Sequence, residues 1–562
     1  MFKEKILSYL KSSKYAMLVL GAEILAVLSI AWPWFLKPGY LFFTDFVWGP
    51  NMPIKWYDNW FFLDLAVRGA AQIIPVDFLQ KVFICLVLFV VVRGAHHLVR
   101  EIILIQKKTE RAPSSGLVFI LSLFALFNPF VYDRVMYGQF NIVAALGFMC
   151  LALACLLSYI RSNKLRAAIG VGVFSGLTIL FSMHFIFPLA LLVLLLVIYT
   201  LLKKQINWKQ FLKVFGLTLF FIITINLNWL LGLTGQMPNV FNAVTIQISS
   251  QDLVAFQTSG KTGGEAITNV LMMSGFWGKD QRRYADLTSF GANWGRSFFL
   301  LLPLILYGVW LGFRSPDKKK RGFTLGLIIL FAVSAFLAIG IRTGPTKAIT
   351  LWLFDHLPFY RGLRETQKWV ALEVVIYLIF LSCGAKELFC KKPVVRLDAV
   401  FKIVLVAIIV MQAPLLLWGF GGQIRPTKYP ADWYQADSKI SATGSCQGNI
   451  LFLPWHAYMS FNWIGNIVSN PAKSFFSCPT ISGTNMEWKG IYDNSGDKNA
   501  QQITKWLVSG GQTNLLTVGN LNVNYIVLAK ELDWQNYLSQ IHDKDFDLIQ
   551  DSATLLVYRI KK

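Results

Sequence analysis

About eleven apolar stretches of roughly 17–23 residues run through the sequence, each long enough to cross a bilayer of about 30 Å as a helix. The composition agrees, because 55% of the residues are hydrophobic and only 15% are charged, against about 25% charged residues in soluble domains. The sequence therefore predicts a polytopic α-helical membrane protein. We expect the transmembrane helices at 15–36, 77–99, 116–132, 140–160, 165–182, 184–202, 212–232, 297–313, 322–340, 368–385 and 399–420.

Short basic segments precede or separate these stretches. Six of them hold 25 of the 53 Lys and Arg residues and only five acidic residues, at 1–14, 93–111, 161–166, 203–213, 314–321 and 386–396. Basic loops stay on the cytoplasmic side of a membrane, and an N-terminus placed there puts all six inside. The longer loops and the tail then lie outside. This scattered charge accounts for the net charge of +23 without a nucleic-acid partner.

The composition changes after residue 420. The tail 421–562 holds 12 Lys and Arg and 11 Asp and Glu residues, without long apolar runs. Strand-like segments alternate with helix-like ones, which indicates a small extracytoplasmic α/β domain after a transmembrane domain at 1–420. Cys446 and Cys478 could form a disulfide there if the tail lies outside the cell. We expect strands at 449–454, 524–530, 546–552 and 554–560, and helices at 500–510 and 531–541.

Asp45 is a lone carboxylate among aromatic residues in LFFTDFVWGP, just beyond the first expected span. A carboxylate at this place could act as a general base toward an acceptor hydroxyl, and poor solvation would raise its proton affinity. The alternative is a helix cap or a turn, for which Thr44-Asp45 is equally suited. Residues 54–68, which follow in the same outer loop, read as an amphipathic helix lying in the membrane interface.

A second candidate segment is FNPFVYDRVMYGQFN at 127–141. Here Asn128-Pro129 is expected to end the short third span, and a tight loop then carries Asp133, Arg134 and Gln139. The guanidinium of Arg134 could grip a phosphate, because it offers several donors in a fork. The alternative is an Asp133–Arg134 or headgroup contact that only positions the loop.

A third candidate is FYRGLRETQKW at 359–369, where the tenth span begins. It places Arg361, Arg364, Glu365 and Lys368 at the outer membrane edge, where basic residues are disfavoured. The i, i+3, i+7 spacing of the three basic residues predicts one helix face, suited to a lipid phosphate. The alternative is that these side chains anchor the next helix by snorkelling.

Trp277, in the outer loop 233–296, offers an aromatic platform that would suit either a sugar ring or the lipid interface. The sequence contains no nucleotide-binding, serine-hydrolase or zinc-protease motif and no His/Cys metal spacing. Charges within the spans are few, chiefly Glu23 and Glu373, whereas an ion-coupled transporter usually needs more. These absences argue against an ATP-driven pump, a serine hydrolase and an ion-coupled transporter.

In layout, residues 1–420 resemble the GT-C superfamily of membrane glycosyltransferases, which carry an acidic residue in the first outer loop. FNPFVYDRVMYGQF and FYRGLRETQKW are similar to segments of bacterial membrane proteins of the arabinofuranosyltransferase type and the YfhO type. The resemblance implies that Asp45 is the catalytic acid/base residue. It also implies that Arg361, Arg364 and Lys368, with Arg134 as a further candidate, bind the lipid-linked phosphate. Supporting candidates are Asp133, Gln139, Glu365 and Trp277.

The sequence therefore predicts a glycosyltransferase that takes sugar from a polyprenyl-phosphate donor and passes it to an extracytoplasmic glycan, lipid or protein acceptor. It would work in the cell membrane with its N-terminus in the cytoplasm. Many GT-C enzymes carry paired acids in the first loop, whereas Asp45 is alone and the next acids are Asp58 and Asp64. A divalent cation is compatible with the pattern, but no ligand set is evident. The alternative function is a non-enzymatic lipid or glycan transporter or a membrane assembly scaffold.

Overall fold

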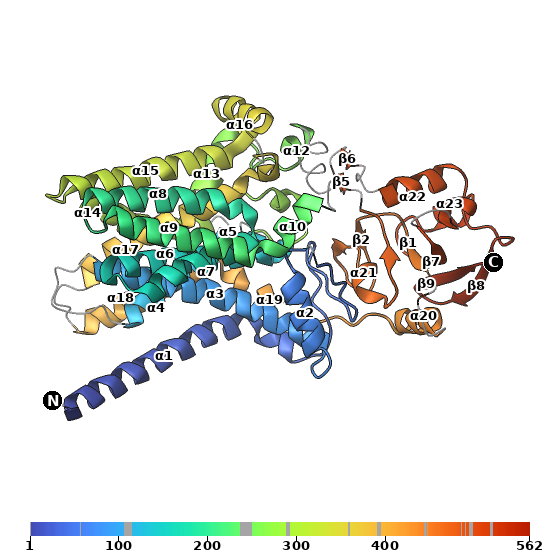
Figure 1. Ribbon diagram of the computed structural model, residues 1–562, viewed down its shortest axis with the longest axis horizontal. Coiled ribbons are helices and arrows are strands. Elements are labelled where there is room, and N and C mark those ends of the chain that lie inside the picture. Colours follow the sequence, from blue (N-terminus) through green and yellow to red (C-terminus); the bar gives the residue numbers. More distant parts are fainter. Residues whose placement is uncertain are drawn as a thin grey trace. The chain divides into compact units, whose positions relative to one another are not determined.

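The computed structural model divides into two compact units, and Figure 1 shows their helices and strands. The first unit comprises 1–32, 83–228 and 256–423, and the second comprises 33–82, 229–255 and 424–562. Parts of the predicted basic segments 93–111 and 386–396 and of the outer loop 233–296 lie outside the described residues. The structure describes residues 2–56, 58–105, 115–235, 250–287, 293–357, 360–389, 395–442, 446, 448–484, 486–488, 491–493, 498–517 and 521–561.

The first unit is helical, and most of its long helices run beside one another in Figure 1, whereas α1 extends away from them toward the N-terminus. Helices α1 and α3 each continue into the second unit, as does α10. The helices are α1 (Phe2–Phe35), α3 (Val76–Ile105), α4 (Ser115–Leu126), α5 (Pro129–Tyr137), α6 (Phe140–Ser162), α7 (Leu165–Phe181), α8 (Ile186–Leu202), α9 (Trp208–Ile225), α10 (Leu227–Gly235), α13 (Gly263–Leu271), α14 (Asn293–Phe313), α15 (Lys318–Ile339), α16 (Gly344–His356), α17 (Val370–Phe389), α18 (Val395–Val410) and α19 (Leu417–Gly421).

Within the described residues, seven helices are long and apolar enough to cross a membrane, and nine if each of two bent pairs is one span. The bent pairs are α4 with α5, at 51°, and α18 with the segment 414–421, at 76°. Two further expected spans, 165–182 and 297–313, correspond to α7 and to most of α14, which are apolar but shorter. The multi-pass architecture is therefore confirmed, whereas the count of eleven is not.

Glycines set how closely α14 and α17 approach. A Cβ added at Gly308 would overlap the carbonyl oxygen of Phe380, and one added at Gly384 would overlap that of Leu304. Small residues allow such backbone contact between helices in a membrane, where packing stabilises a bundle that the hydrophobic effect cannot hold together. The two glycines therefore hold α17, which leads from the candidate phosphate-binding segment, directly against α14.

The second unit holds the C-terminal α/β region, and this prediction is confirmed. Its helices are α2 (Phe61–Ala70), α12 (Ser250–Ala255), α20 (Ala431–Ser441), α21 (Ala472–Phe475), α22 (Lys498–Val508), α23 (Asn514–Thr517) and α24 (Gln535–Leu538). Its strands are β1 (Asn449–Leu453), β2 (Tyr458–Ser460), β3 (Ile467–Ser469), β4 (Thr480–Ile481), β5 (Met486–Trp488), β6 (Ile491–Asp493), β7 (Val523–Ala529), β8 (Phe546–Asp551) and β9 (Leu555–Ile560).

Five strands form a mixed sheet in the order β4-β1-β7-β9-β8, in which β1 runs parallel to β4 and β7. Alternate residues of β1 face opposite sides. Leu451 and Leu453 pack in the core that contains α22, whereas Phe452 meets the ring of Trp433 on α20. Because both faces are covered, the strand reads as a continuous apolar run and not as an alternating one.

The helix expected at 531–541 is largely wrong, since only the single turn α24 forms there. Leu532 has a positive φ of 52°, which interrupts a helix. The side chain of Glu531 accepts hydrogen bonds from Asn462, and Asp533 lies 3.0 Å from the ring of His456. Tertiary contacts of these two acids therefore replace the regular helix.

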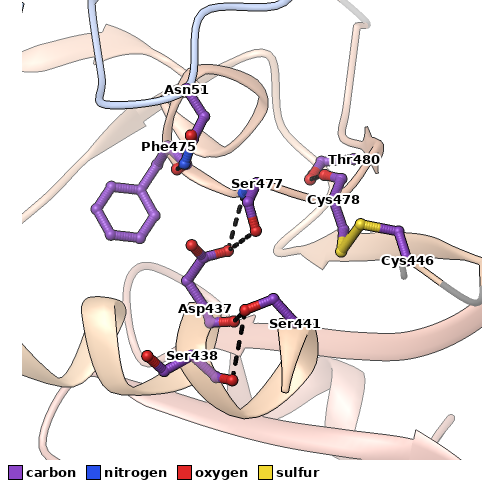
Figure 2. Close-up of a disulfide and its surroundings, with 9 residues drawn as sticks. All are labelled: Asn51, Asp437, Ser438, Ser441, Cys446, Phe475, Ser477, Cys478 and Thr480. Carbon is purple, nitrogen blue, oxygen red and sulfur yellow. Dashed lines mark hydrogen bonds between the residues drawn. A yellow bond between two sulfur atoms is a disulfide. The ribbon is translucent and has the colours of Figure 1, made fainter. Parts of the chain in front are cut away.

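Cys446 and Cys478 form a disulfide with their Cα atoms 5.5 Å apart (Figure 2). Beside it, the amide and hydroxyl of Ser477 donate hydrogen bonds of 2.8 and 2.9 Å to Asp437 on α20. The bridge joins the chain before β1 to the chain before β4. Disulfides persist in oxidising compartments, so this bond agrees with the extracytoplasmic location expected for the tail.

The segment 33–82 is bound to the tail within the second unit by backbone and side-chain hydrogen bonds. Tyr40 and Thr427 exchange two backbone hydrogen bonds of 2.8 and 2.9 Å, and the amide of Ser469 donates to the carbonyl of Thr44. In this segment α2 forms at 61–70, later than the start of the expected amphipathic helix at 54–68. The first outer loop is thus part of the same compact unit as the C-terminal domain.

Candidate functional site

Helix α5 carries the centre of the candidate site and corrects the expectation of a loop after Asn128-Pro129. Asn128 caps α5, its side chain accepting from the amide of Val131 at 3.0 Å, and Pro129 occupies the first helical turn. Both residues are favoured at a helix start. The pair therefore ends α4 and begins a second, fully buried helix, which Gly138 closes in a left-handed conformation.

Arg134 on α5 is fully buried. Its Nη1 atom donates to Gln139 Oε1 and, at 2.7 Å, to Glu365 Oε2. The guanidinium carbon lies 4.3 Å from the ring centroid of Phe276 and 5.6 Å from that of Phe130. Its Nε and Nη2 atoms are buried without a hydrogen-bond partner among the described residues. Two donors of a buried cation are thus left over, which is costly unless a ligand accepts from them.

Glu365 is the acid around which the basic side chains gather. Burial opposes its charged form, but Lys368, Arg134 and Arg364 outweigh that effect and lower its pKa to about 2. The carboxylate is therefore ionised throughout the physiological range. This single negative charge does not balance the three neighbouring positive charges, so the cluster is positively charged.

The three basic residues of 361–368 do not lie on one helix face, so this expectation is wrong. The segment forms two 3₁₀ turns, Tyr360–Leu363 and Thr366–Trp369, and α17 begins only at Val370. The second turn is held by tertiary hydrogen bonds, because Thr366 donates to the carbonyl of Ala338, and Gln367 donates to that of Phe256. Sequence spacing could not predict this irregular backbone.

The basic side chains consequently reach different partners. Arg361 donates to the carbonyl of Phe354 on α16 at 3.4 Å, and Arg364 lies over the ring of Phe256 at 4.9 Å. Lys368 is buried, with its Nζ atom 3.4 Å from Nε2 of His184. Arg364 and Lys368 therefore lie with Arg134 around Glu365. Arg361 is instead hydrogen-bonded to α16.

Trp277 lies in the aromatic packing behind Arg134. It is 6% exposed and packs edge-on against Tyr137 and Phe256, with ring centroids 5.1 and 4.6 Å away. Its neighbour Phe276 lies under the guanidinium of Arg134. As placed, Trp277 supports this aromatic wall and offers no open face to a sugar ring.

Asp133 joins α5 to the segment that follows Trp277. Its Oδ1 atom accepts from the hydroxyl of Tyr284 at 3.0 Å, while Oδ2 is buried without a partner among the described residues. Tyr137 on the same helix donates to Gln281 at 2.8 Å. These bonds hold 277–286 against α5, so Asp133 positions the wall of the site, and no direct Asp133–Arg134 bond is needed.

Asp45 lies in the second unit and is exposed. Its Oδ1 atom accepts from the hydroxyl of Tyr458, 413 residues later in the chain, at 2.9 Å. No helix begins at residues 44–45, which rules out the helix-cap interpretation and leaves a bend. The expectation of a poorly solvated carboxylate is therefore wrong, because Asp45 is exposed.

The next acids of the first outer loop, Asp58 and Asp64, have different environments. Asp58 Oδ1 accepts from the amide of Trp60, and Asp64 is buried on α2, where burial and then the charge of Asp58 raise its pKa to about 7. Among the described residues, no group of three or more His, Cys, Asp or Glu side chains could hold a metal ion.

Two residues that the sequence did not single out as functional complete these environments. His184 contacts Lys368 from the break between α7 and α8, and the only sequence signal for it is the short interruption Ser182-Met183-His184 between two apolar stretches. Tyr458 contacts Asp45 from β2, for which the sequence offered no signal. Both contacts join segments that are far apart in the chain.

Comparison with known proteins gives a fold. No family model matches the sequence, and no curated protein matches it. The structure is similar to that of the arabinofuranosyltransferase AftD from Mycobacteria, with a TM-score of 0.60 and 13% identity over 98% of this chain. Two structures of a mutant of AftD match with TM-scores of 0.58 and 0.56 and identities of 13% and 12%, over 97% of this chain.

The present chain spans 40–41% of the length of the AftD chains that it matches. The similarity extends over nearly all of the present chain, so it concerns the architecture as a whole and not one short motif. We therefore conclude that this chain has a fold like that of the arabinofuranosyltransferase AftD, in agreement with the GT-C-like fold expected from the sequence.

Proposed function

We propose that this protein is a GT-C-type glycosyltransferase that moves a sugar from a polyprenyl-phosphate donor to an extracytoplasmic glycan, lipid or protein acceptor. The observation that carries the proposal is Arg134, a buried guanidinium with two donors left over beside Arg364 and Lys368. A phosphate oxygen is a natural acceptor for such donors, because a guanidinium forms strong, directed hydrogen bonds to phosphate. The GT-C-like fold supports the same reading.

The charges suit the leaving group of this reaction. Three cations surround one carboxylate, Glu365, so the cluster carries an excess of about two positive charges. The phosphodiester of a polyprenyl-phosphate sugar carries one negative charge. When its bond to the anomeric carbon breaks, the departing polyprenyl phosphate carries a second. Fixed positive charge near that oxygen stabilises the transition state more than the ground state.

Asp45 is the proposed general base. The acceptor hydroxyl would attack the anomeric carbon and lose its proton to the Asp45 carboxylate as the carbon–oxygen bond to phosphate breaks. Tyr458, which donates a hydrogen bond to Oδ1 of Asp45, would hold this carboxylate in position. Such a base contributes typically about 10²–10⁴-fold to a rate.

The proposed location is the outer face of the cell membrane. The six basic segments favour a cytoplasmic N-terminus and place the loop of Asp45, the segment 359–369 and the tail on the other side. The disulfide between Cys446 and Cys478 supports an oxidising environment for the tail. Both halves of the proposed chemistry would then face one aqueous compartment.

The second candidate function is a non-enzymatic lipid or glycan transporter or an assembly scaffold. It is favoured by Asp45, which is solvent-exposed and bonded to Tyr458, unlike a carboxylate held in a dry reaction site. In that case the Arg134 cluster would hold a lipid headgroup without any bond being broken.

The test is sugar transfer by the purified full chain in proteoliposomes with a radiolabelled polyprenyl-phosphate sugar. We expect turnover of the donor, a loss of about 10²–10⁴-fold in Asp45→Asn and a loss of similar order in Arg364→Gln. Asp543→Asn, which alters an exposed acid of the tail, is the control and should transfer normally. Full transfer by Asp45→Asn would remove the proposed base, and lipid movement without donor turnover would favour the transporter.

A further inference from the structure

A cavity of about 760 Å³ lies within the second unit, and its lining includes neither Asp45 nor the residues around Arg134. Three stretches of chain line it: 38–40 with 50–52 from the first outer loop, 67–77 from α2 and the start of α3, and 428–434 from the tail. Its size falls in the range of about 300–1,000 Å³ usual for small-molecule sites. The unit therefore contains a hollow built from both the outer loop and the tail.

Hydrogen bonds fix the walls of this cavity. The backbone bridge between Tyr40 and Thr427 joins two of the lining stretches, and the amide of Gly39 donates to Asp77 Oδ2 at 2.6 Å. On the other side, Asn51 donates to the carbonyl of Phe475 at 2.7 Å. A pocket whose walls are already bonded together loses little entropy on binding.

The lining has the chemistry of a sugar-binding surface. Tyr434 is 46% exposed and can offer a ring face to the C–H groups of a sugar. Gln72, Asn51 and Arg68 add amide and guanidinium groups that bond hydroxyls in fixed planes. Donors and acceptors are mixed, as a polyhydroxylated ligand requires.

Phosphate fits this cavity less well than sugar. Its two basic side chains, Arg68 and Lys428, are exposed, and the carboxylate of Asp77 shares the lining. An anion would gain little from solvated cations and would be repelled by the carboxylate. The buried guanidinium of Arg134, in the first unit, is the better phosphate site.

We infer that this cavity is a binding site for a neutral glycan, the acceptor side of the proposed transfer reaction, and this inference rests on the proposed function. The two ends of the short segment 38–52, at 38–40 and 50–52, line the cavity, and Asp45 lies between these ends in the sequence. Cavity and proposed base thus belong to one compact unit, while the proposed phosphate site belongs to the other. The division separates acceptor recognition from donor recognition.

Binding can be measured without any reaction. Neutral tetrasaccharides of arabinofuranose, mannose, galactose or glucose, and inorganic phosphate as a separate probe, are titrated into the full chain in detergent by calorimetry. We expect that one of the tetrasaccharides binds in the cavity and that phosphate does not bind there. Tyr434→Ala should weaken sugar binding about tenfold through the lost ring contact, and Ala71→Trp, which fills the cavity, should abolish it.

Trp352→Ala removes a similarly exposed aromatic side chain from α16, outside the cavity, and should bind sugar normally. Circular dichroism and thermal unfolding of each variant separate lost binding from lost folding. The inference is overturned if no tetrasaccharide binds, if sugar binds equally well to folded Ala71→Trp, or if phosphate binding is what Ala71→Trp removes.

The outcome is separable from that of the proposed function. Asp45→Asn should still bind the tetrasaccharide in the cavity, although its rate of sugar transfer falls by about 10²–10⁴-fold. If Tyr434→Ala transfers sugar with an unaltered KM for the acceptor, the cavity is not the acceptor site, but the proposed glycosyltransferase activity still holds. If the cavity binds sugar but the protein turns over no donor, the proposed enzymatic activity is refuted. The cavity is then a glycan-binding site without a role in transfer.

Discussion

Arg134 on α5 and Glu365, 231 residues later, form a buried ion pair with 2.7 Å between Nη1 and Oε2. The pair closes the bent α4–α5 segment against the turn that leads into α17. Removing one partner of such a pair leaves the other charged and buried, which costs more than the pair itself contributes. The pair thus holds the candidate phosphate site in shape, while Nε and Nη2 of Arg134 are buried without a hydrogen-bond partner among the described residues.

Glu365→Gln should destabilise the protein near neutral pH by about 3–5 kcal/mol, because Arg134 would lose its counter-charge. The pKa of Glu365 is lowered from 4.5 to about 2, so its contribution is present above pH 4.5 and is lost as the pH falls toward 2. Thermal unfolding of the purified protein between pH 7 and pH 3 checks this. The difference between wild type and Glu365→Gln should shrink on acidification, and a constant difference would contradict the assignment.

Arg134→Lys should impair sugar transfer by about 10²-fold even though the charge is kept. Lysine offers a single point of charge and cannot reproduce the planar fork that reaches Glu365 and a ligand at once. The rate at saturating donor is the quantity to measure. Arg283→Lys, which alters a cation over the ring of Tyr137 on the same helix, is the matched control. Equal rates for both variants would mean that the fork of Arg134 has no part in the reaction.

Asp64→Asn should stabilise the protein at alkaline pH. The pKa of Asp64 is raised from 3.8 to about 7 by burial and by Asp58, so the native state holds its proton longer than the unfolded state. Stability therefore falls as the pH rises between about 4 and 7, and the amide removes this loss. Unfolding midpoints at pH 5 and pH 8 should differ less in Asp64→Asn than in wild type. Asp543→Asn should leave the difference unchanged.

Gly384→Ala should lower the stability of the helix bundle by about 1–3 kcal/mol, because the added methyl group would push α17 away from the Leu304 carbonyl on α14. Gly322→Ala, at a glycine of α15 with open space around it, should be neutral or slightly stabilising. Thermal unfolding in one detergent compares the two. Similar losses in both variants would show that close approach at Gly384 is unimportant.

Cys446→Ser with Cys478→Ser should destabilise the tail by about 3–4 kcal/mol, since the bridge closes a loop with a sequence separation of 32. The tail of this double variant should be cleaved faster by protease, while Cys85→Ser, which alters a free thiol, should behave as wild type. In intact cells, impermeant thiol reagents should label neither cysteine unless a reductant is added first. Labelling without reductant would show that the bond does not form.

Local sequence patterns predicted a good part of the fold. The strands at 449–453 and 523–529 and the helix at 498–508 form where apolar runs and helical spacing placed them. Long apolar stretches need little tertiary information to become helices, because a backbone in lipid must satisfy its own hydrogen bonds. The third span was the exception, because the pair Asn128-Pro129 is equally compatible with the end of one helix and with the start of the next.

The candidate site was predicted only as a set of residues. The spacing of Arg361, Arg364 and Lys368 suggested a helix face, but hydrogen bonds to Ala338 and Phe256 hold that segment in two 3₁₀ turns. These partners lie tens of residues away in the chain. No local propensity reports such contacts, which is why the geometry of this segment could not be predicted.

The sequence by itself determined that this chain enters a membrane many times, which ends of its helices carry the basic loops, and where an α/β domain follows. Those features depend on hydropathy, charge and local periodicity, which are properties of the local sequence and need no knowledge of tertiary contacts. Only the tertiary structure decided that Arg134 meets Glu365, that Asp45 meets Tyr458, and that the first outer loop shares a cavity with the tail. Such pairings depend on which distant surfaces pack together, and packing is a property of the whole fold.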